Sequence, residues 1–155
     1  MVTSEPDTDQ VNALMGASRV LVALSVRSLA ATAETVTLLQ LRLLVVLASQ
    51  GGTNLSTLAE TVGVHVSNAS RTCEALVQMG LVDRRDDPDD RRNVILAVRD
   101  QGRQVVNNVL NRRRELLADL LRQLSAADRE ALVGPLQRLV AAAGPIPALD
   151  IWSVS

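Results

Sequence analysis

The sequence predicts a mainly α-helical fold that carries one small β hairpin. Apolar residues recur every three or four positions along most of the chain, which is the spacing of amphipathic helices. The 155 residues include no Phe, no Tyr and a single Trp, so Leu, Val and Ala must fill the core, a composition that suits packed helices. Only the segment from Leu81 to Val98 departs clearly from helical spacing.

Six helices are expected from this spacing. The first carries apolar residues on two faces at once, so it needs two partners to be buried. Thr37 can cap the second helix, which Gly51 ends. Pro135 is expected to kink the last helix, because proline removes one helical hydrogen bond. The predicted helices are Val11–Ala33, Leu38–Ser49, Asn54–Val62, about Val66–Met79, Gly102–Leu124 and a last one from Ser125 to about Ala143.

The third and fourth helices and the segment after them form one unit. A close crossing of two helices needs a small residue at the crossing and a turn residue that tolerates positive φ, and Ala59 and Gly63 meet these needs. The following segment has apolar residues on both sides of a polar turn at residues 86–90, which predicts a β hairpin. These features predict a winged helix-turn-helix lobe, with an ordinary helix pair as the alternative.

The fourth helix has a polar outer face at its start. Arg71 can bind the edge of a guanine through two hydrogen bonds, and Asn68 can bind an adenine in the same way. The more ordinary role of such residues is capping, so we expect one of His65 and Ser67 to cap the helix and the others to contact DNA. The candidate residues are His65, Ser67, Asn68, Ser70 and Arg71.

The tip of the hairpin is rich in charge, with the sequence RRDDPDDRR at residues 84–92. Strand alternation places Asp90 and Arg92 on one side, so the carboxylate can hold the guanidinium in a fixed pose. An arginine held in this way can enter the minor groove of DNA. In a solvated turn the charges would merely cancel, and only the position after the helix pair favours DNA contact. The candidates here are Arg84, Asp90, Arg91 and Arg92.

The sequence resembles the MarR family of bacterial regulators. The resemblance rests on LLQLRLL at 38–44, LAETVGV at 58–64, Arg71, Leu76, GLV at 80–82, Arg84, Arg85 and DPDDRR at 87–92. It extends from about Leu38 to Gly102, and the flanking helices match in kind only. Two departures concern helix starts: His65 replaces the commoner Ser or Thr, and Asp100 is expected to replace a missing Thr cap.

The resemblance implies a homodimer that binds a palindromic operator in double-stranded DNA and often represses transcription. Ser67, Asn68, Ser70 and Arg71 would read the major groove, and Arg92, ordered by Asp90, would lie in the minor groove. Members of this family often release DNA when a small aromatic acid or phenol binds between the dimer helices and the DNA-binding lobe. A small-molecule effector of unknown identity is therefore a candidate partner.

These inferences divide the chain into four parts. We expect a disordered N-terminal segment at 1–10 and a dimerisation helix at 11–36. The winged helix-turn-helix DNA-binding lobe occupies 37–101, and C-terminal dimerisation helices and a tail occupy 102–155. The flanking helices expose more apolar surface than one subunit can bury, which is a second reason to expect a dimer.

Composition argues against several other classes of protein. The net charge of −1 excludes coating of nucleic acid by bulk positive charge, so any DNA binding must come from local placement. A single Cys73 and a single His65 provide neither a zinc site nor a catalytic nucleophile pair, so we expect no metal, no cofactor and no enzymatic activity. The longest aliphatic run, Leu43–Ala48, is too short to span a membrane, and a cytoplasmic protein is expected.

Two alternatives to DNA binding remain at this point. A dimeric winged-helix module that binds another protein is favoured by the nearly neutral net charge. Such a module would be expected to present an apolar patch where this sequence has polar and Arg-rich surfaces. A purely structural helical dimer would leave the hairpin unexplained.

Overall fold

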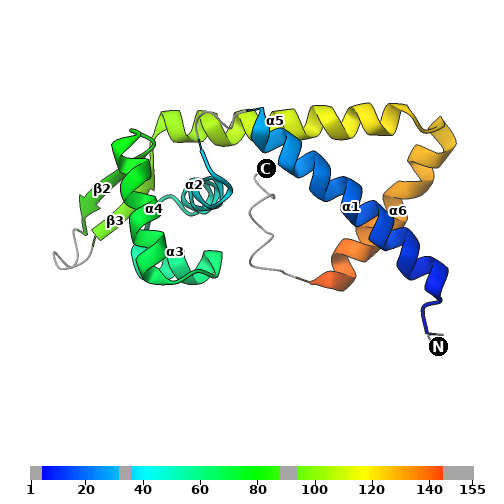
Figure 1. The fold of residues 1–155 in the computed structure, drawn as a ribbon, viewed down its shortest axis with the longest axis horizontal. Coiled ribbons are helices and arrows are strands. Elements are labelled where there is room, and N and C mark those ends of the chain that lie inside the picture. The colour runs from blue at the N-terminus through cyan, green and yellow to red at the C-terminus, as the bar shows by residue number, and fades with distance from the viewer. Residues whose placement is uncertain (1–4, 32–35, 88–93, 145–155) are drawn as a thin grey trace.

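The computed structural model describes residues 5–31, 36–87 and 94–144. It divides into a lobe at one end and, at the other, the helices α1 (Thr8–Ala30) and α6 (Ala126–Ala143), which we call the arms (Figure 1). The lobe contains α2 (Leu38–Gln50), α3 (Leu55–Val62), α4 (Val66–Gln78) and a small sheet. The long helix α5 (Asp100–Arg122) leaves the lobe and leads to α6, while α1 packs against α5. The expected mainly helical winged fold is confirmed.

The sheet has three antiparallel strands in the order β1-β3-β2. The expected hairpin consists of β2 (Val82–Asp86) and β3 (Val94–Val98), in which Arg84 pairs with Leu96. The third strand, β1 (Thr53–Asn54), was not expected from the sequence. It has only two residues and is defined by its pairing with β3, so no alternating pattern could reveal it.

The core of the lobe is built around α2. Leu43, Leu44 and Leu47 of this helix are completely buried. They belong to one cluster with buried side chains of α4 and α5, such as Leu76 and Val109. Burial of a Leu side chain contributes about 1.5–3 kcal/mol, so the lobe has a substantial core of its own within a single chain.

Two helices, α1 and α2, begin with the same type of N-terminal cap. α2 begins as expected after Thr37, whose side chain accepts from the Gln40 amide while the Gln40 side chain accepts from the Thr37 amide. α1 begins at Thr8, earlier than expected, because Asp7 and Gln10 form the same reciprocal capping box. Residues 8–10, which we expected in a disordered segment, are therefore helical.

One other expectation about a helix start is wrong. The N-cap residue of α5 is Arg99, and no side chain caps this helix. Asp100 instead lies in the first helical turn, where its negative charge interacts favourably with the helix dipole. α6 runs from Ala126 to Ala143, as expected, with Pro135 inside it, and the expected kink at Pro135 stays a prediction.

The arms leave most of their apolar side chains exposed. α6 has no buried residue, and α1 buries only Leu24 and Ser28. The exposed large apolar residues include Val11, Leu14, Met15, Val20, Leu21, Val22 and Val26 on α1, and Leu132, Val133, Leu136, Leu139 and Val140 on α6. A surface of this kind, contributed by several helices, is typical of an unfilled protein interface.

α1 is also long and apolar enough, by length and composition alone, to cross a membrane. The expectation that no segment could span a membrane rested on unbroken aliphatic runs. In α1 the Val, Leu and Ala residues keep the mean hydropathy high although polar residues interrupt them. Core helices of soluble proteins and signal sequences pass the same test.

Candidate nucleic-acid interface

The turn between α3 and α4 has the geometry of a helix-turn-helix. α3 ends at Gly63, whose φ of 72° lies in the left-handed region that favours glycine. The Gly63 amide donates to the Glu60 carbonyl and the Val64 amide donates to the Ala59 carbonyl, both at 3.0 Å. Ala59 is buried, as a residue at a close helix crossing must be. The expected role of Gly63 at the turn is therefore confirmed, and the burial of Ala59 agrees with the role expected for it.

α4 separates an apolar inner face from a polar outer face. Ala69, Cys73 and Leu76 are buried against the lobe. The candidate DNA-contacting side chains in its first half are all exposed, namely Ser67, Asn68, Ser70 and Arg71. Within the described part of the chain, the side chains of these four residues form no hydrogen bond or ion pair, so their polar groups are available to a ligand.

The start of α4 is open. His65 occupies the N-cap position, but its side chain makes no capping hydrogen bond, and Ser67 makes none either. The expectation that one of these two side chains caps the helix is therefore wrong. His65 contributes only its backbone carbonyl, which accepts from the amides of Asn68 and Ala69 at 3.0 Å. An uncapped helix start with its positive dipole end can receive an anion such as phosphate.

The base of the wing is held by one carboxylate. Asp83 on β2 pairs with Arg85 at 3.2 Å and with Arg99, which follows β3, at 3.5 Å. Asp83 therefore connects the two ends of the hairpin at its base. Asp90, Arg91 and Arg92, the other candidates on the wing, lie outside the described residues.

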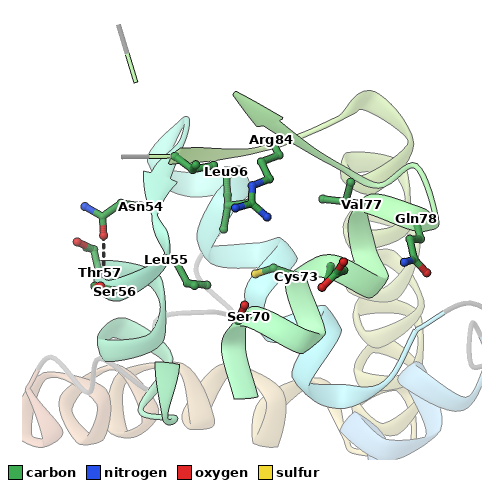
Figure 2. Close-up of a pocket in the computed structure, with 12 residues that line it drawn as sticks. Asn54, Leu55, Ser56, Thr57, Ser70, Cys73, Val77, Gln78, Arg84 and Leu96 are labelled. Carbon is green, nitrogen blue, oxygen red and sulfur yellow. Dashed lines mark hydrogen bonds between the residues drawn. The ribbon is translucent and has the colours of Figure 1, made fainter. Parts of the chain in front are cut away.

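The sequence groups Arg84 with the charged tip of the hairpin, but this residue lies on β2, opposite Leu96 of β3. It shares a face of the sheet with Leu96, and its side chain points from β2 into a cavity toward α4 (Figure 2). The cavity has a volume of about 450 Å³. Its lining comes from Asn54, Leu55, Ser56, Thr57, Ser70, Cys73, Glu74, Val77, Gln78, Arg84, Val94 and Leu96. No sequence pattern predicts this cavity, because its lining residues come from α3, α4 and all three strands.

Cys73 is the only cysteine of the chain and lies beside this cavity. Burial raises the pKa of its thiol from 9.0 to about 11, because the charged thiolate would lose its hydration. The thiol is therefore protonated at neutral pH. The expected burial of Cys73 is confirmed, and its low reactivity stays a prediction. Among the described residues, no group of three or more His, Cys, Asp or Glu side chains could hold a metal ion.

A helix-turn-helix with an open, polar second helix and a hairpin directly after it defines the class of winged helix-turn-helix DNA-binding proteins. The MarR family matches this chain over residues 36–94. The HTH-type transcriptional regulator Mb0904 of Mycobacterium bovis is 34% identical over 97 residues, which are 63% of this chain and 68% of that protein. The chain belongs to the MarR family.

Solved structures agree with this assignment. RV1404 from Mycobacterium tuberculosis superposes with a TM-score of 0.81 at 38% identity, over 94% of this chain and all of that one. A mutant of S. aureus MepR bound to an oligodeoxyribonucleotide shares the fold, with a TM-score of 0.68 at 18% identity over 90% of this chain and 99% of that one.

Membership in this family establishes the coarse function. The chain is a DNA-binding transcriptional regulator of the MarR family, and it is not an enzyme. Both expectations from the sequence are confirmed. The two alternatives, a module that binds another protein and a purely structural dimer, do not describe the function of this family.

Proposed function

We propose that the chain acts as a homodimeric repressor that binds a palindromic operator. In this proposal α4 enters the major groove, and the wing contacts the adjacent minor groove. The observation that carries the proposal is the polar start of α4, where four exposed side chains have no partner within the described protein and the helix end is uncapped. Polar groups left available on an exposed helix face can exchange their bound water for base edges and phosphates.

The proposed roles of individual residues follow their chemistry. Arg71 pairs with a guanine edge and Asn68 with an adenine edge, while Ser67 and Ser70 contact bases or phosphates beside them. His65, at the open end of α4, donates to a phosphate. On the wing, Asp90 orients Arg92 in the minor groove and Arg91 contacts the backbone. Arg84 belongs to the same surface from the side of the cavity.

The exposed apolar faces of α1 and α6 support the homodimer. Large apolar residues on two arm helices need a covering partner, and a second copy of the chain carries the complementary faces by symmetry. We assign 11–36 and 102–155 to dimerisation and 37–101 to DNA binding. Two copies of α4 related by a two-fold axis would meet successive major grooves roughly 10 base pairs apart.

Repression and location follow from the same arrangement. A dimer seated on an operator that overlaps a promoter blocks access of RNA polymerase to the DNA. Such a protein binds chromosomal DNA, so we place the protein in the bacterial cytoplasm.

A small-molecule effector is also part of the proposal. The resemblance suggests a site between the dimer helices and the lobe, whereas the described cavity lies within the lobe, between α4 and the sheet. The lining contains the Arg84 guanidinium and the Glu74 carboxylate, and Leu55, Val77 and Leu96 supply apolar contacts. In this proposal Arg84 binds the carboxylate of a small organic acid. Salicylate can be used as a probe: it should release DNA from the parent protein and do so less well from Arg84→Met than from Arg85→Met.

The proposal is tested by selection of bound duplexes from a random pool, followed by a salt titration. An enriched palindrome and a steep decrease of affinity with salt are expected for operator binding through phosphates. Sedimentation at micromolar concentration should show a dimer. A stable monomer, or a pool in which no sequence is enriched, would show that the proposal is wrong.

A further inference from the structure

One contact from outside the helix-turn-helix reaches its turn. The Nη2 atom of Arg42 on α2 donates a hydrogen bond of 2.7 Å to the backbone carbonyl of Val62, and the contact is partly buried. Val62 is the last residue of α3, immediately before Gly63. The carbonyls in the last turn of a helix have no partner within the helix and carry its negative dipole end. Arg42 therefore satisfies one of these carbonyls with a charged donor.

The other bonds of the turn explain why this donor is needed. Amides of the turn already bond to the Ala59 and Glu60 carbonyls. The Val62 carbonyl lies beyond them and faces α2, so a side chain from α2 can reach it. The next helix starts only four residues later, at Val66, and its N-cap residue makes no side-chain bond. Among the described residues, Arg42 thus provides the side-chain hydrogen bond that ties this turn to the core helix.

We propose that Arg42 is a positioning residue for DNA binding, which fixes the turn and through it the direction in which α4 leaves the lobe. The inference depends on the proposed role of α4 in the major groove. α4 has 13 residues, so a small rotation at the turn moves the side chains on its outer face relative to the bases. Base-reading side chains must be held within a fraction of an ångström to make paired hydrogen bonds, and this contact supplies part of that restraint.

A second arginine on the lobe offers a matched control. Arg103 on α5 donates through Nη1 to the carbonyl of Ala48 at 3.2 Å, near the end of α2. The chemistry is the same as at Arg42, an arginine that bonds to a carbonyl near a helix end, but the contact lies away from the turn before α4. Loss of Arg103 therefore removes one charge and one bond of the same type without releasing that turn.

The test compares Arg42→Gln, Arg42→Met, Arg42→Lys and Arg103→Gln in the full-length protein. Affinity for the duplex that the parent selects from a random pool is measured by fluorescence anisotropy over a range of salt concentrations, together with the melting temperature. We expect Arg42→Gln and Arg42→Met to bind roughly fivefold to tenfold more weakly, with an unchanged salt slope. Arg42→Lys should recover most of the affinity, and Arg103→Gln should stay within about twofold of the parent.

Amide hydrogen exchange of the free protein gives a readout that does not depend on DNA. In Arg42→Met the amides of Gly63 and Val64 should exchange faster than in the parent, whereas in Arg103→Gln they should not. If one of the two neutral variants at position 42 does not fold, the other carries the comparison.

Two results would overturn the inference. A salt slope that falls by about one in Arg42→Gln would mean that Arg42 itself contacts a phosphate. Equal affinities of Arg42→Met and Arg103→Gln would mean that the turn contact has no effect on α4. Arg71→Ala, measured in the same series, separates this inference from the proposed function. Suppose that one of these results is observed. If Arg71→Ala then binds DNA as well as the parent does, the assignment of α4 to the major groove is wrong. If Arg71→Ala binds more weakly than the parent, α4 still contacts DNA and only the proposed role of Arg42 is wrong.

Discussion

The lobe and the arms contain similar amounts of Leu, Val and Ala, but most of these side chains are buried in α2 of the lobe and none is buried in α6. In α2 six side chains are buried, among them Leu43, Leu44 and Leu47 with no exposure at all. In α6 no side chain is buried, and Val140 is 71% exposed. The difference shows that the same apolar pattern has two outcomes: in the lobe it closes a core within one chain, whereas in α1 and α6 it leaves an exposed apolar surface, which the proposed dimer would cover.

The largest expected effect comes from a leucine inside the lobe. Leu47→Ala should lower the free energy of unfolding by about 2–5 kcal/mol, because it removes buried methyl groups and leaves a cavity. Urea unfolding followed by circular dichroism measures the loss. The matched variant Leu139→Ala in α6 should leave the stability of the lobe unchanged and increase the dissociation constant of the dimer in sedimentation. Equal losses of lobe stability in both variants would contradict the division into lobe and arms.

The next effect concerns the junction between the two regions. A Cβ atom at Gly102 would overlap the backbone oxygen of Leu81 and lie 2.8 Å from a side-chain carbon of Val98. Gly102→Ala should therefore force α5 away from the wing, at a cost of about 1–3 kcal/mol. The gain of about 1 kcal/mol in helix propensity from Ala offsets only part of this cost. Thermal unfolding measures the result, with Gly16→Ala as the control, since Gly16 has open space around its Cβ position.

An effect of similar size, on binding rather than on stability, is expected at the bases. Arg71→Ala should weaken binding to the selected duplex by about 1–3 kcal/mol and relax base choice at one position in each half-site. Arg92→Ala should weaken binding to all duplexes alike. Repeated selection with each variant distinguishes the two patterns, and an unchanged selected sequence with Arg71→Ala would contradict direct base reading.

Removal of a single N-cap hydrogen bond should lower stability differently in the lobe and in the arms. Thr37→Ala removes the cap of α2 and should cost the lobe about 1 kcal/mol. Ser125→Ala removes the equivalent cap of α6, where Ser125 accepts from the Asp128 amide. Because α6 does not contribute to the lobe core, this second variant should fray the arm without lowering the midpoint of lobe unfolding. A common shift of both midpoints would indicate one cooperative unit.

The smallest effect at neutral pH concerns Cys73. Burial gives its thiol a higher pKa in the folded state, about 11 instead of 9.0, so the folded state holds the proton more tightly. The resulting stability is complete below pH 9 and is lost as the pH rises from 9 toward 11. Native protein should therefore react slowly with iodoacetamide at pH 8 and quickly in urea. Fast labelling of the native protein would contradict the buried, protonated thiol.

The lobe could be predicted from the sequence because local signals repeat there at every level. Thr37, Gly51 and Gly63 mark helix ends through their side-chain oxygen or their tolerance of positive φ, and the structure uses them so. The polar and apolar faces of α4 followed from helical spacing alone. The roles of the individual residues in DNA contact remain predictions.

Features that arise from tertiary contact could not be read in this way. The two-residue strand β1, the cavity and the direction of Arg84 depend on elements brought together from separate parts of the chain. The bond from Arg42 to Val62 spans 20 residues and has no periodic signal. Asp7 and Gln10 did carry a local signal, a capping box, and the early start of α1 could have been found from it.

The apolar length of α1 has a consequence for the life of the subunit in the cell. In the proposed dimer α1 is covered, so a single protomer would instead expose a long apolar helix of the kind that chaperones and proteases bind. Surplus single subunits would be cleared or would aggregate, while assembled ones would persist. The amount of active regulator would then depend on how quickly newly made chains find each other, and turnover would remove the remainder.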